Sequence, residues 1–179
     1  MEALHPFGQQ PWLAGTELKA GARWQQGLLH VHFALNTPAE TLVRPLACGQ
    51  IQRRDGLWQS TCFEAFFADP AHEHYWEINL APHGHWNVYR LDRYRQGLQP
   101  EPQVSALTYS LHQSASDLQL RFSLNLEPLI ASIERLDLSL TAVLEHPEHG
   151  CSYWALHHAG NEADFHRRDS FRSLLRTDA

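Results

Sequence analysis

The chain has 179 residues, of which 43% are hydrophobic and 19% are charged. This balance is typical of a folded globular protein and excludes disorder and fibrous repeats. Fourteen Lys and Arg against twenty Asp and Glu give a net charge of −6, which argues against binding nucleic acid through a general basic surface. No apolar run approaches the roughly 20 residues that span a bilayer, so we expect no membrane segment.

The cysteines and the first residues of the chain indicate the cellular compartment. Cys48, Cys62 and Cys151 are odd in number and widely spaced, which argues against a disulfide framework or a zinc knuckle. The first residues lack the basic and apolar regions of a secretion signal. We therefore expect a cytoplasmic protein that forms one domain over residues 1–179.

Alternation of apolar and polar residues is the dominant pattern along the chain, and it predicts strands with one buried face. In chain order, we expect strands at residues 29–35, 62–68, 75–81, 85–91, 107–111, 118–126, 136–142 and 152–157. The turn-forming sequence Pro-His-Gly at 82–84 predicts a hairpin between the third and fourth of these strands.

Helical patterns are scarce. We expect one short turn at 129–133 and a terminal helix at 170–176, with loops at 38–56 and 97–102. Many short strands separated by turns favour two packed antiparallel layers. The predicted fold is therefore all-β, an antiparallel β-sandwich with little helix.

Acidic and amide side chains are expected on one face of the strand at 75–81. Alternation places Trp76, Ile78 and Leu80 on its core face, and Glu77 and Asn79 on the other. Glu64 on a neighbouring strand can join the second group. Indole faces beside carboxylate and amide groups suit a sugar, whose C–H face stacks while its hydroxyls form hydrogen bonds.

A plainer interpretation of the same residues stays open. Aromatic side chains mostly serve packing, so Trp58, Trp76 and Trp86 would lie in the core. Glu64 and Glu77 would then form ion pairs with Arg93 or Arg95 on a solvated sheet.

The middle of the chain resembles a known family. The runs are Trp-x-x-x-x-Phe-Glu-x-Phe-Phe-x-Asp at 58–69 and Tyr-Trp-Glu-Ile-Asn-x-x-Pro-x-Gly-x-Trp at 75–86, with Ala-Asp-Phe-His at 163–166. They are similar to DOMON-like proteins related to the family 9 carbohydrate-binding modules. The resemblance implies a jelly-roll-like β-sandwich whose ligand site binds sugars in some members and haem in others.

The resemblance also implies roles for individual residues. Trp58 matches a stacking aromatic, Glu64 the strand glutamate and Asn79 the hairpin asparagine, while Arg93 is a weaker match to a sugar-binding arginine. The chain departs from the carbohydrate-binding modules just before Glu64, where Ser-Thr-Cys at 60–62 replaces acidic residues. A structural calcium site is therefore not carried over.

Metal and haem sites are alternatives to a sugar site. Thirteen histidines include three pairs that are two residues apart: His30/His32, His72/His74 and His83/His85. A metal site needs three converging ligands, and the spacing shows only pairs. Haem ligation by Met and His would need an interior methionine, whereas Met1 is the single methionine; a bis-His site stays possible. We expect no cofactor and no metal.

Catalysis has weaker support than binding. No Gly-x-Ser-x-Gly elbow occurs, although Glu64 and Glu77 could be the acid and nucleophile of a glycoside hydrolase. The leading hypothesis is a non-catalytic module that binds a small sugar or similar polyhydroxylated ligand. The alternatives are a haem- or metal-binding redox module and a hydrolase. The expected ligand-binding residues are Trp58, Glu64, Glu77, Asn79, Trp86, Tyr89 and Arg93.

Overall fold

The computed structural model describes residues 1–39, 41–42, 49–130 and 133–177, and strands dominate this part of the chain. The strands are β1 (Glu2–Pro6), β2 (Glu17–Gln25), β3 (Leu28–Asn36), β4 (Cys62–Ala68), β5 (Tyr75–Leu80), β6 (Trp86–Leu91), β7 (Gln99–Pro100), β8 (Thr108–Gln113), β9 (Asp117–Asn125), β10 (Arg135–His146), β11 (Gly150–Ala155) and β12 (Arg172–Thr177). The helical elements among the described residues are three single 3₁₀ turns, η1 (Pro11–Leu13), η2 (Leu57–Gln59) and η3 (Arg168–Ser170).

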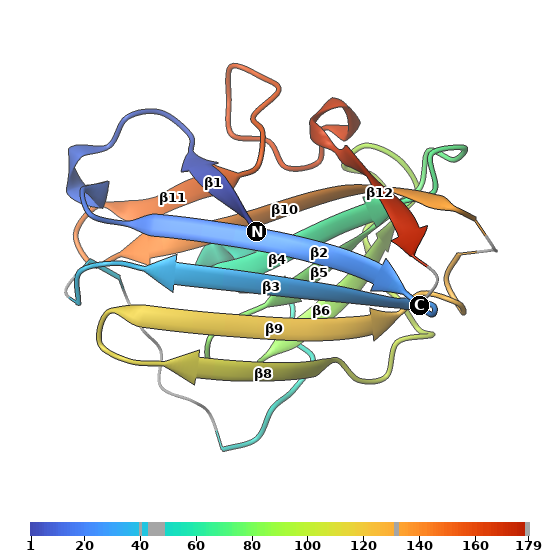
Figure 1. The fold of residues 1–179 in the computed structure, drawn as a ribbon, viewed down its shortest axis with the longest axis horizontal. Helices are drawn as coiled ribbons and strands as arrows, with labels where there is room; N and C mark the ends of the chain where they lie inside the picture. Colours follow the sequence, from blue (N-terminus) through green and yellow to red (C-terminus); the bar gives the residue numbers. More distant parts are fainter. Residues whose placement is uncertain (40, 43–48, 131–132, 178–179) are drawn as a thin grey trace.

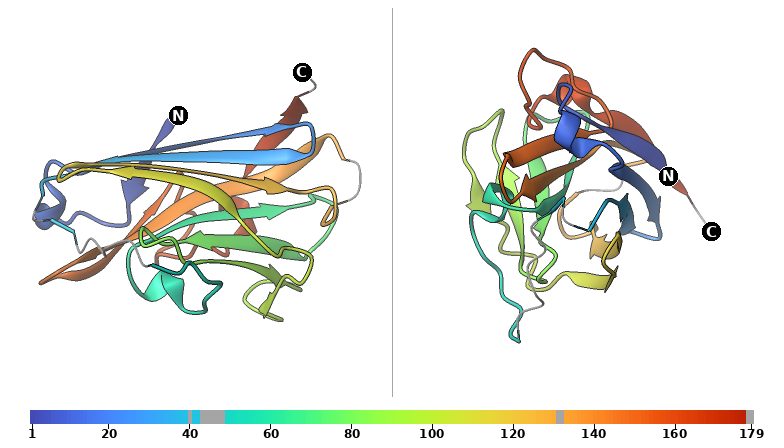
Figure 2. Two further views of the ribbon diagram at one scale, coloured as in Figure 1. Left: turned by 90° about the horizontal axis from the view of Figure 1, so that it is seen from below. Right: turned by 90° about the vertical axis from the view of Figure 1, so that its left-hand side faces the viewer.

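The strands form two layers, as predicted (Figures 1 and 2). The front sheet has the order β1-β2-β3-β9-β8, and the back sheet has the order β7-β6-β5-β4-β10-β11. Short strands join the layers at their edges. β1 pairs with β2 and with β11, and β12 pairs antiparallel with β10 and parallel with β2. The fold is an antiparallel β-sandwich, and the sequence prediction of the fold class is confirmed.

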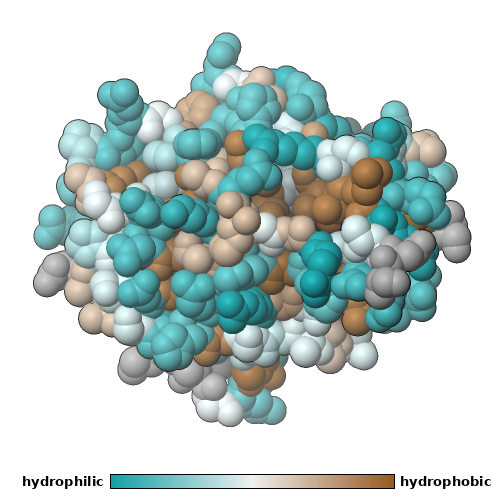
Figure 3. Space-filling view, viewed as in Figure 1, coloured by the Kyte–Doolittle hydropathy of each residue, from teal (hydrophilic) through white to brown (hydrophobic). Residues whose placement is uncertain are grey.

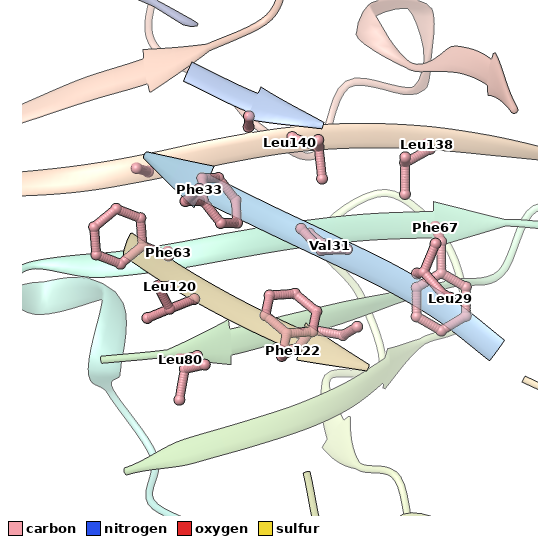
Figure 4. Close-up of a cluster of buried hydrophobic side chains, with 14 of the residues drawn as sticks. Leu29, Val31, Phe33, Phe63, Phe67, Leu80, Leu120, Phe122, Leu138 and Leu140 are labelled. Atoms are coloured by element: carbon pink, nitrogen blue, oxygen red, sulfur yellow. The ribbon is translucent and has the colours of Figure 1, made fainter. Parts of the chain in front are cut away.

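The core lies between the two sheets, while the outer face of the front sheet is largely hydrophilic (Figure 3). Phe33 of β3 and Phe63 of β4 meet across the layers with ring centroids 5.2 Å apart. Val31 and Leu120 belong to the same cluster, and Phe67 lies farther along β4 (Figure 4). The longer strands contribute alternate residues to this cluster, because successive side chains of a strand point to opposite faces.

The predicted hairpin is formed by β5 and β6, with Ile78 opposite Val88. Its turn contains Gly84 at φ +96°, a left-handed conformation that side chains rarely adopt. A Cβ atom at this position would also collide with the Tyr109 hydroxyl of β8. Glycine is therefore required both by the backbone and by the close approach of the front sheet.

Two local predictions differ from the structure. The terminal helix predicted at 170–176 is wrong, because these residues follow η3 and form β12, whose Leu174 pairs with Leu136 of β10. Backbone pairing with two strands outweighs the weak helical propensity of so short a segment. The loop predicted at 97–102 contains the short strand β7, which pairs with β6.

Other predicted segments lie partly outside the described residues. The turn predicted at 129–133 includes residues 131–132, which lie outside the described part. Just before them, Ile130 donates its backbone N–H to the Leu126 carbonyl. The loop predicted at 38–56 includes 40 and 43–48, which are also outside the described part. Near its end, Arg53 forms an isolated bridge with Trp86 of β6. Within the described ranges, no helix is long and apolar enough to cross a membrane.

Candidate functional site

The outer face of the back sheet carries the acidic residues singled out in the sequence. Glu64 of β4 lies opposite Asn79 of β5, and Phe66 lies opposite Glu77, so all four side chains share one face. The opposite face of β5 enters the core with Trp76 and Ile78. The predicted division of β5 into a core face and a polar face is therefore observed.

A hollow of about 350 Å³ lies over this face. Its most buried lining residues come from the sheet. Its rim comes from Tyr153 of β11 and from segments that fold back over the sheet at 57–60, 95–98 and 165–166. The full lining consists of Trp58, Glu64, Phe66, Glu77, Leu91, Arg95, Leu98, Val143, Tyr153, Phe165 and His166. The site is therefore assembled from parts of the chain that are distant in sequence.

Glu64 lies at the buried end of the hollow, with 2% of its surface exposed. The Thr141 hydroxyl of the neighbouring strand β10 donates to Glu64 Oε2 at 3.3 Å. Oε1 is buried and has no hydrogen-bond partner among the described residues. A buried carboxyl oxygen without a hydrogen-bond partner destabilises the fold. This oxygen is therefore available for a hydrogen bond with a bound molecule.

Glu77 and Asn79 form a second polar pair on the same strand. The Asn79 amide donates to Glu77 Oε1 at 2.7 Å. The amide oxygen of Asn79 is buried and, within the described part of the chain, has no hydrogen-bond partner. The floor thus presents two carboxyls, while Asn79 supports Glu77 from behind without lining the hollow itself.

Both floor carboxyls hold their protons more tightly than usual. Burial raises the pKa of Glu64 well above its ordinary value, and the charge of Glu77 raises it further, against hydrogen bonds from Thr141 and the Cys62 thiol. Burial raises the pKa of Glu77 to about 7, against the opposing Asn79 hydrogen bond and the charge of Arg95. The raised pKa favours the protonated form of the Glu64 carboxyl, which can both donate and accept hydrogen bonds.

One wall of the hollow is fixed by Asp164. Its carboxylate accepts hydrogen bonds from the Arg95 guanidinium at 2.8 Å, from the Tyr94 hydroxyl and from the backbone N–H of His166. These contacts join the turn after β6 to the segment that leads from β11 to η3. Two residues of the wall, Arg95 and His166, are held in place by this one carboxylate.

His166 contributes a neutral imidazole to the wall. Burial and the nearby charge of Arg95 lower its pKa to about 4. The Tyr75 hydroxyl accepts the backbone N–H of Arg95 at 3.3 Å and lies 2.8 Å from His166 Nδ1. Because a neutral imidazole has one donor and one acceptor nitrogen, donation from Tyr75 to Nδ1 leaves the proton on Nε2.

Aromatic rings form the exposed rim. Trp58 is 36% exposed and Tyr153 is 41% exposed. Trp58 contacts Tyr89 edge-on, with ring centroids 5.8 Å apart, and the Tyr89 hydroxyl donates to Asp55 at 2.7 Å. Tyr89 itself is buried and does not line the hollow; it orients Trp58 from below.

The structure brings together some of the predicted site residues and separates others. Trp58, Glu64 and Glu77 line the hollow, and Asn79 and Tyr89 lie directly behind them.

Trp86 and Arg93 do not join them, which corrects two expectations. Trp86 pairs with Leu80 and therefore points into the core, where it is 6% exposed beneath the Arg53 guanidinium. Arg93 is exposed, bonds to Gln96, and lies outside the lining of the hollow.

Several lining residues were not predicted. Arg95, Leu98, Phe165 and His166 come from irregular segments whose sequences carry no period that would place them. For the last two, the resemblance of 163–166 to a family segment was the available signal. Tyr153 could have been found from the alternation in β11, where it pairs with Val143 on the outer face.

The histidine pairs do not form a metal site within the described residues, since no three His, Cys, Asp or Glu side chains gather there as ligands. The rings of His83 and His85 lie 4.6 Å apart, and those of His72 and His74 lie 5.0 Å apart. Both pairs belong to segments that flank β5, away from the lining of the hollow.

Comparison with known proteins shows the fold. No family model matches the chain, and no curated protein matches it in sequence. A solved structure of a proposed carbohydrate-binding protein from Bacteroides uniformis is similar with a TM-score of 0.71 and 11% identity, over 98% of this chain and 85% of that one. Similarities that cover almost the whole chain at so low an identity show a shared β-sandwich.

Two further solved structures are family 9 carbohydrate-binding modules from Caldicellulosiruptor kristjanssonii. The one in complex with glucose has a TM-score of 0.59 at 10% identity, over 97% of this chain and 81% of that one. The one in complex with cellotriose has a TM-score of 0.60 at 9% identity, over 99% and 82%.

Proposed function

We propose that the chain is a carbohydrate-binding module that holds a small sugar in the hollow over the back sheet. The observation that carries this proposal is the arrangement of its lining: two carboxyls at the buried end and two partly exposed aromatic rings, Trp58 and Tyr153, at the rim. Ligand hollows typically combine apolar walls with a few polar groups that fix orientation. This one has that composition and, at about 350 Å³, suits a small ligand.

The polar groups match the hydroxyls of a sugar. A protonated Glu64 offers a donor and an acceptor, and its Oε1 has no hydrogen-bond partner among the described residues. A sugar hydroxyl is also both donor and acceptor, so one hydroxyl satisfies this atom without burying a charge. The indole and phenol faces can pack against the C–H groups of the ring.

The similar structures support the same ligand class. Two of them hold glucose and cellotriose, and a third is described as a proposed carbohydrate-binding protein. At 9% to 11% identity they do not transfer individual contacts, so the residues proposed here rest on the hollow itself. Kinship with DOMON-like proteins, a jelly-roll strand order, a single domain over 1–179 and a cytoplasmic location belong to the same proposal and rest on the sequence patterns.

Calorimetric titration with glucose, cellobiose and cellotriose tests the proposal. We expect measurable binding that Trp58→Ala weakens about tenfold, as the loss of an aromatic contact of about 1.4 kcal/mol implies. Trp12→Ala is the matched control, because Trp12 is also partly exposed but stacks on His149 away from the hollow. No heat with any of these sugars from the folded protein would contradict the proposal.

A glycoside hydrolase is the second candidate, because Glu64 and Glu77 line the same hollow and both pKa values are raised. Hydrolysis requires one carboxyl to be protonated and the other ionised. Turnover of a chromogenic glycoside that disappears in Glu64→Gln would favour this activity. Binding without turnover would favour the module.

A further inference from the structure

A second hollow, of about 550 Å³, lies on the outer face of the front sheet, over β2, β3, β9 and β8. Strand alternation sends Trp24, Val31 and Phe122 inward to the core and leaves their neighbours along each strand, such as Arg23 and Arg121, facing outward. This is the largely hydrophilic face in Figure 3. It is separated from the sugar hollow by the full thickness of the sandwich.

The strand register places cationic and imidazole side chains side by side in this hollow. Arg23 of β2 lies opposite His30 of β3, and His32 lies opposite Arg121 of β9. Gly21, opposite His32, adds no side chain of its own, and Met1 lies against it at that end of the row. From strand spacing and rise, the Cα atoms of Arg23 and Arg121 are roughly 12 Å apart.

The positive charge here is not balanced by nearby acids. Neither Arg23 nor Arg121 forms an ion pair within the described part of the chain, and no Asp or Glu lines the hollow. By contrast, Arg167, Arg168 and Arg172 each pair with a carboxylate. The hollow therefore carries two guanidinium groups that no described carboxylate neutralises, in a chain of net charge −6.

The lining excludes a neutral sugar stacked on aromatic rings. Phe122 is buried and Tyr109 is partly buried, so neither presents an open ring face comparable with Trp58. Guanidinium groups instead recognise carboxylates, often through two parallel hydrogen bonds. Each of the two guanidinium groups can bind a carboxylate of its own, so a ligand that carries two carboxylates can engage both arginines.

We propose that this hollow is a second binding site, which takes a linear acidic oligosaccharide carrying carboxylates on separate sugar units. The hydroxyls of Thr108, Ser110 and Ser123 also line it and can bond to sugar hydroxyls between the charges. An acidic peptide would be expected at an open strand edge, where its backbone can pair. The hollow lies over the middle of the sheet, which favours the glycan.

Titration with a hexamer of galacturonic acid at low ionic strength tests this site. We expect binding that the double variant Arg23→Gln/Arg121→Gln weakens about tenfold, the factor for two exposed ion pairs of up to ~1 kcal/mol each. Added salt should weaken it as well, and methyl esterification of the carboxylates should abolish it. The matched control is Arg93→Gln/Arg135→Gln, which removes two exposed arginines outside the hollow.

The outcomes separate this proposal from the sugar hollow. Absence of binding by the wild-type chain, or equal weakening in the control variant, would overturn it. A glutamate hexapeptide or single-stranded DNA bound as tightly as the galacturonate hexamer would overturn the assignment to a glycan. Trp58→Ala should leave binding of the galacturonate hexamer unchanged, because Trp58 lies outside this hollow. Failure of neutral sugars to bind would therefore contradict only the proposed site over the back sheet.

Discussion

The Arg95 guanidinium and the Asp164 carboxylate, which are 69 residues apart in sequence, form an ion pair 2.8 Å long at the wall of the hollow over the back sheet. The backbone of Arg95 has φ +52°, an uncommon conformation for a residue other than glycine. The pair therefore holds a strained turn against the segment that follows β11. This contact, and not the sheet alone, gives the hollow its shape.

Asp164→Asn should loosen this wall. The variant keeps the size of the side chain but removes its charge, and we expect a loss of about 1 kcal/mol in the free energy of unfolding, since Arg95 is half exposed. Sugar affinity should fall as well, because Arg95 and His166 lose their common anchor. Urea unfolding and calorimetry measure the two effects.

Asp169→Asn is the control for this prediction. Asp169 pairs with Arg167 nearby in the same segment, but neither residue lines the sugar hollow. Equal loss of affinity in both variants would show that Asp164 has no special role in positioning the wall.

Glu77 makes the stability of the fold depend on pH. Its pKa rises from 4.5 to about 7 on folding, so between these values the folded state retains a proton that the unfolded state has lost. The free energy of unfolding therefore falls as pH rises through this window, by about 3 kcal/mol in total. Glu77→Gln removes this contribution.

The expected result is that Glu77→Gln gains stability relative to wild type as pH rises from 4.5 to 7.5. The difference between the two proteins is the informative quantity, because His166, whose pKa is lowered to about 4, acts in the opposite direction over part of the range. Glu73→Gln, at an exposed position, is the control for the loss of one carboxyl. Parallel curves for wild type and Glu77→Gln would contradict a buried, protonated Glu77.

Thr141→Val should lower the free energy of unfolding, because it removes a hydrogen bond to the buried Glu64 carboxyl. The Thr141 hydroxyl gives the one hydrogen bond that the Glu64 carboxyl receives from a described hydroxyl or amide, and valine has nearly the same shape. We expect a loss of about 1–2 kcal/mol in the free energy of unfolding. Thr141→Ser keeps the hydroxyl and should restore most of it; if serine and valine are equally destabilising, packing at this position is responsible.

Gly84→Ala should destabilise the hairpin more than a comparable change elsewhere. Gly8, at φ +76°, has open space around it, so Gly8→Ala measures the backbone strain alone, about 1 kcal/mol. Gly84→Ala adds the collision with the Tyr109 hydroxyl. Tyr109→Phe should recover part of the added loss when combined with Gly84→Ala, and no recovery would place the strain in the turn itself. Thermal unfolding of the four variants measures these differences.

The sequence patterns predict the strands that line the core because burial on one face enforces alternation. The same alternation correctly places Glu64 and Glu77 on the outer face. Alternation places Trp86 and Val88 on the same face of β6, but it does not show which face of β6 is inward. The inward face follows from the pairing of Trp86 with Leu80 of β5. β2 was missed because Gly21 and Ala22 interrupt its alternation with small residues.

The walls of the hollow were largely unpredictable for a different reason. Arg95, Leu98, Phe165 and His166 lie in irregular segments, where no period relates sequence to orientation. Their positions depend on single contacts between distant residues, such as Arg95 with Asp164 and Tyr75 with His166. The strands and the acidic end of the site can therefore be predicted from local pattern, whereas the walls require the tertiary structure.

Iodide quenching of Trp58 fluorescence tests the central claim most directly. Four of the six tryptophans, Trp24, Trp76, Trp86 and Trp154, are only 3% to 6% exposed, so a Trp12→Phe background leaves Trp58 as the accessible reporter. If the hollow binds sugar, saturating glucose or cellotriose should reduce quenching in this background and should have no effect after the further change Trp58→Phe. Quenching of Trp58 that is the same with and without these sugars would contradict binding at the hollow.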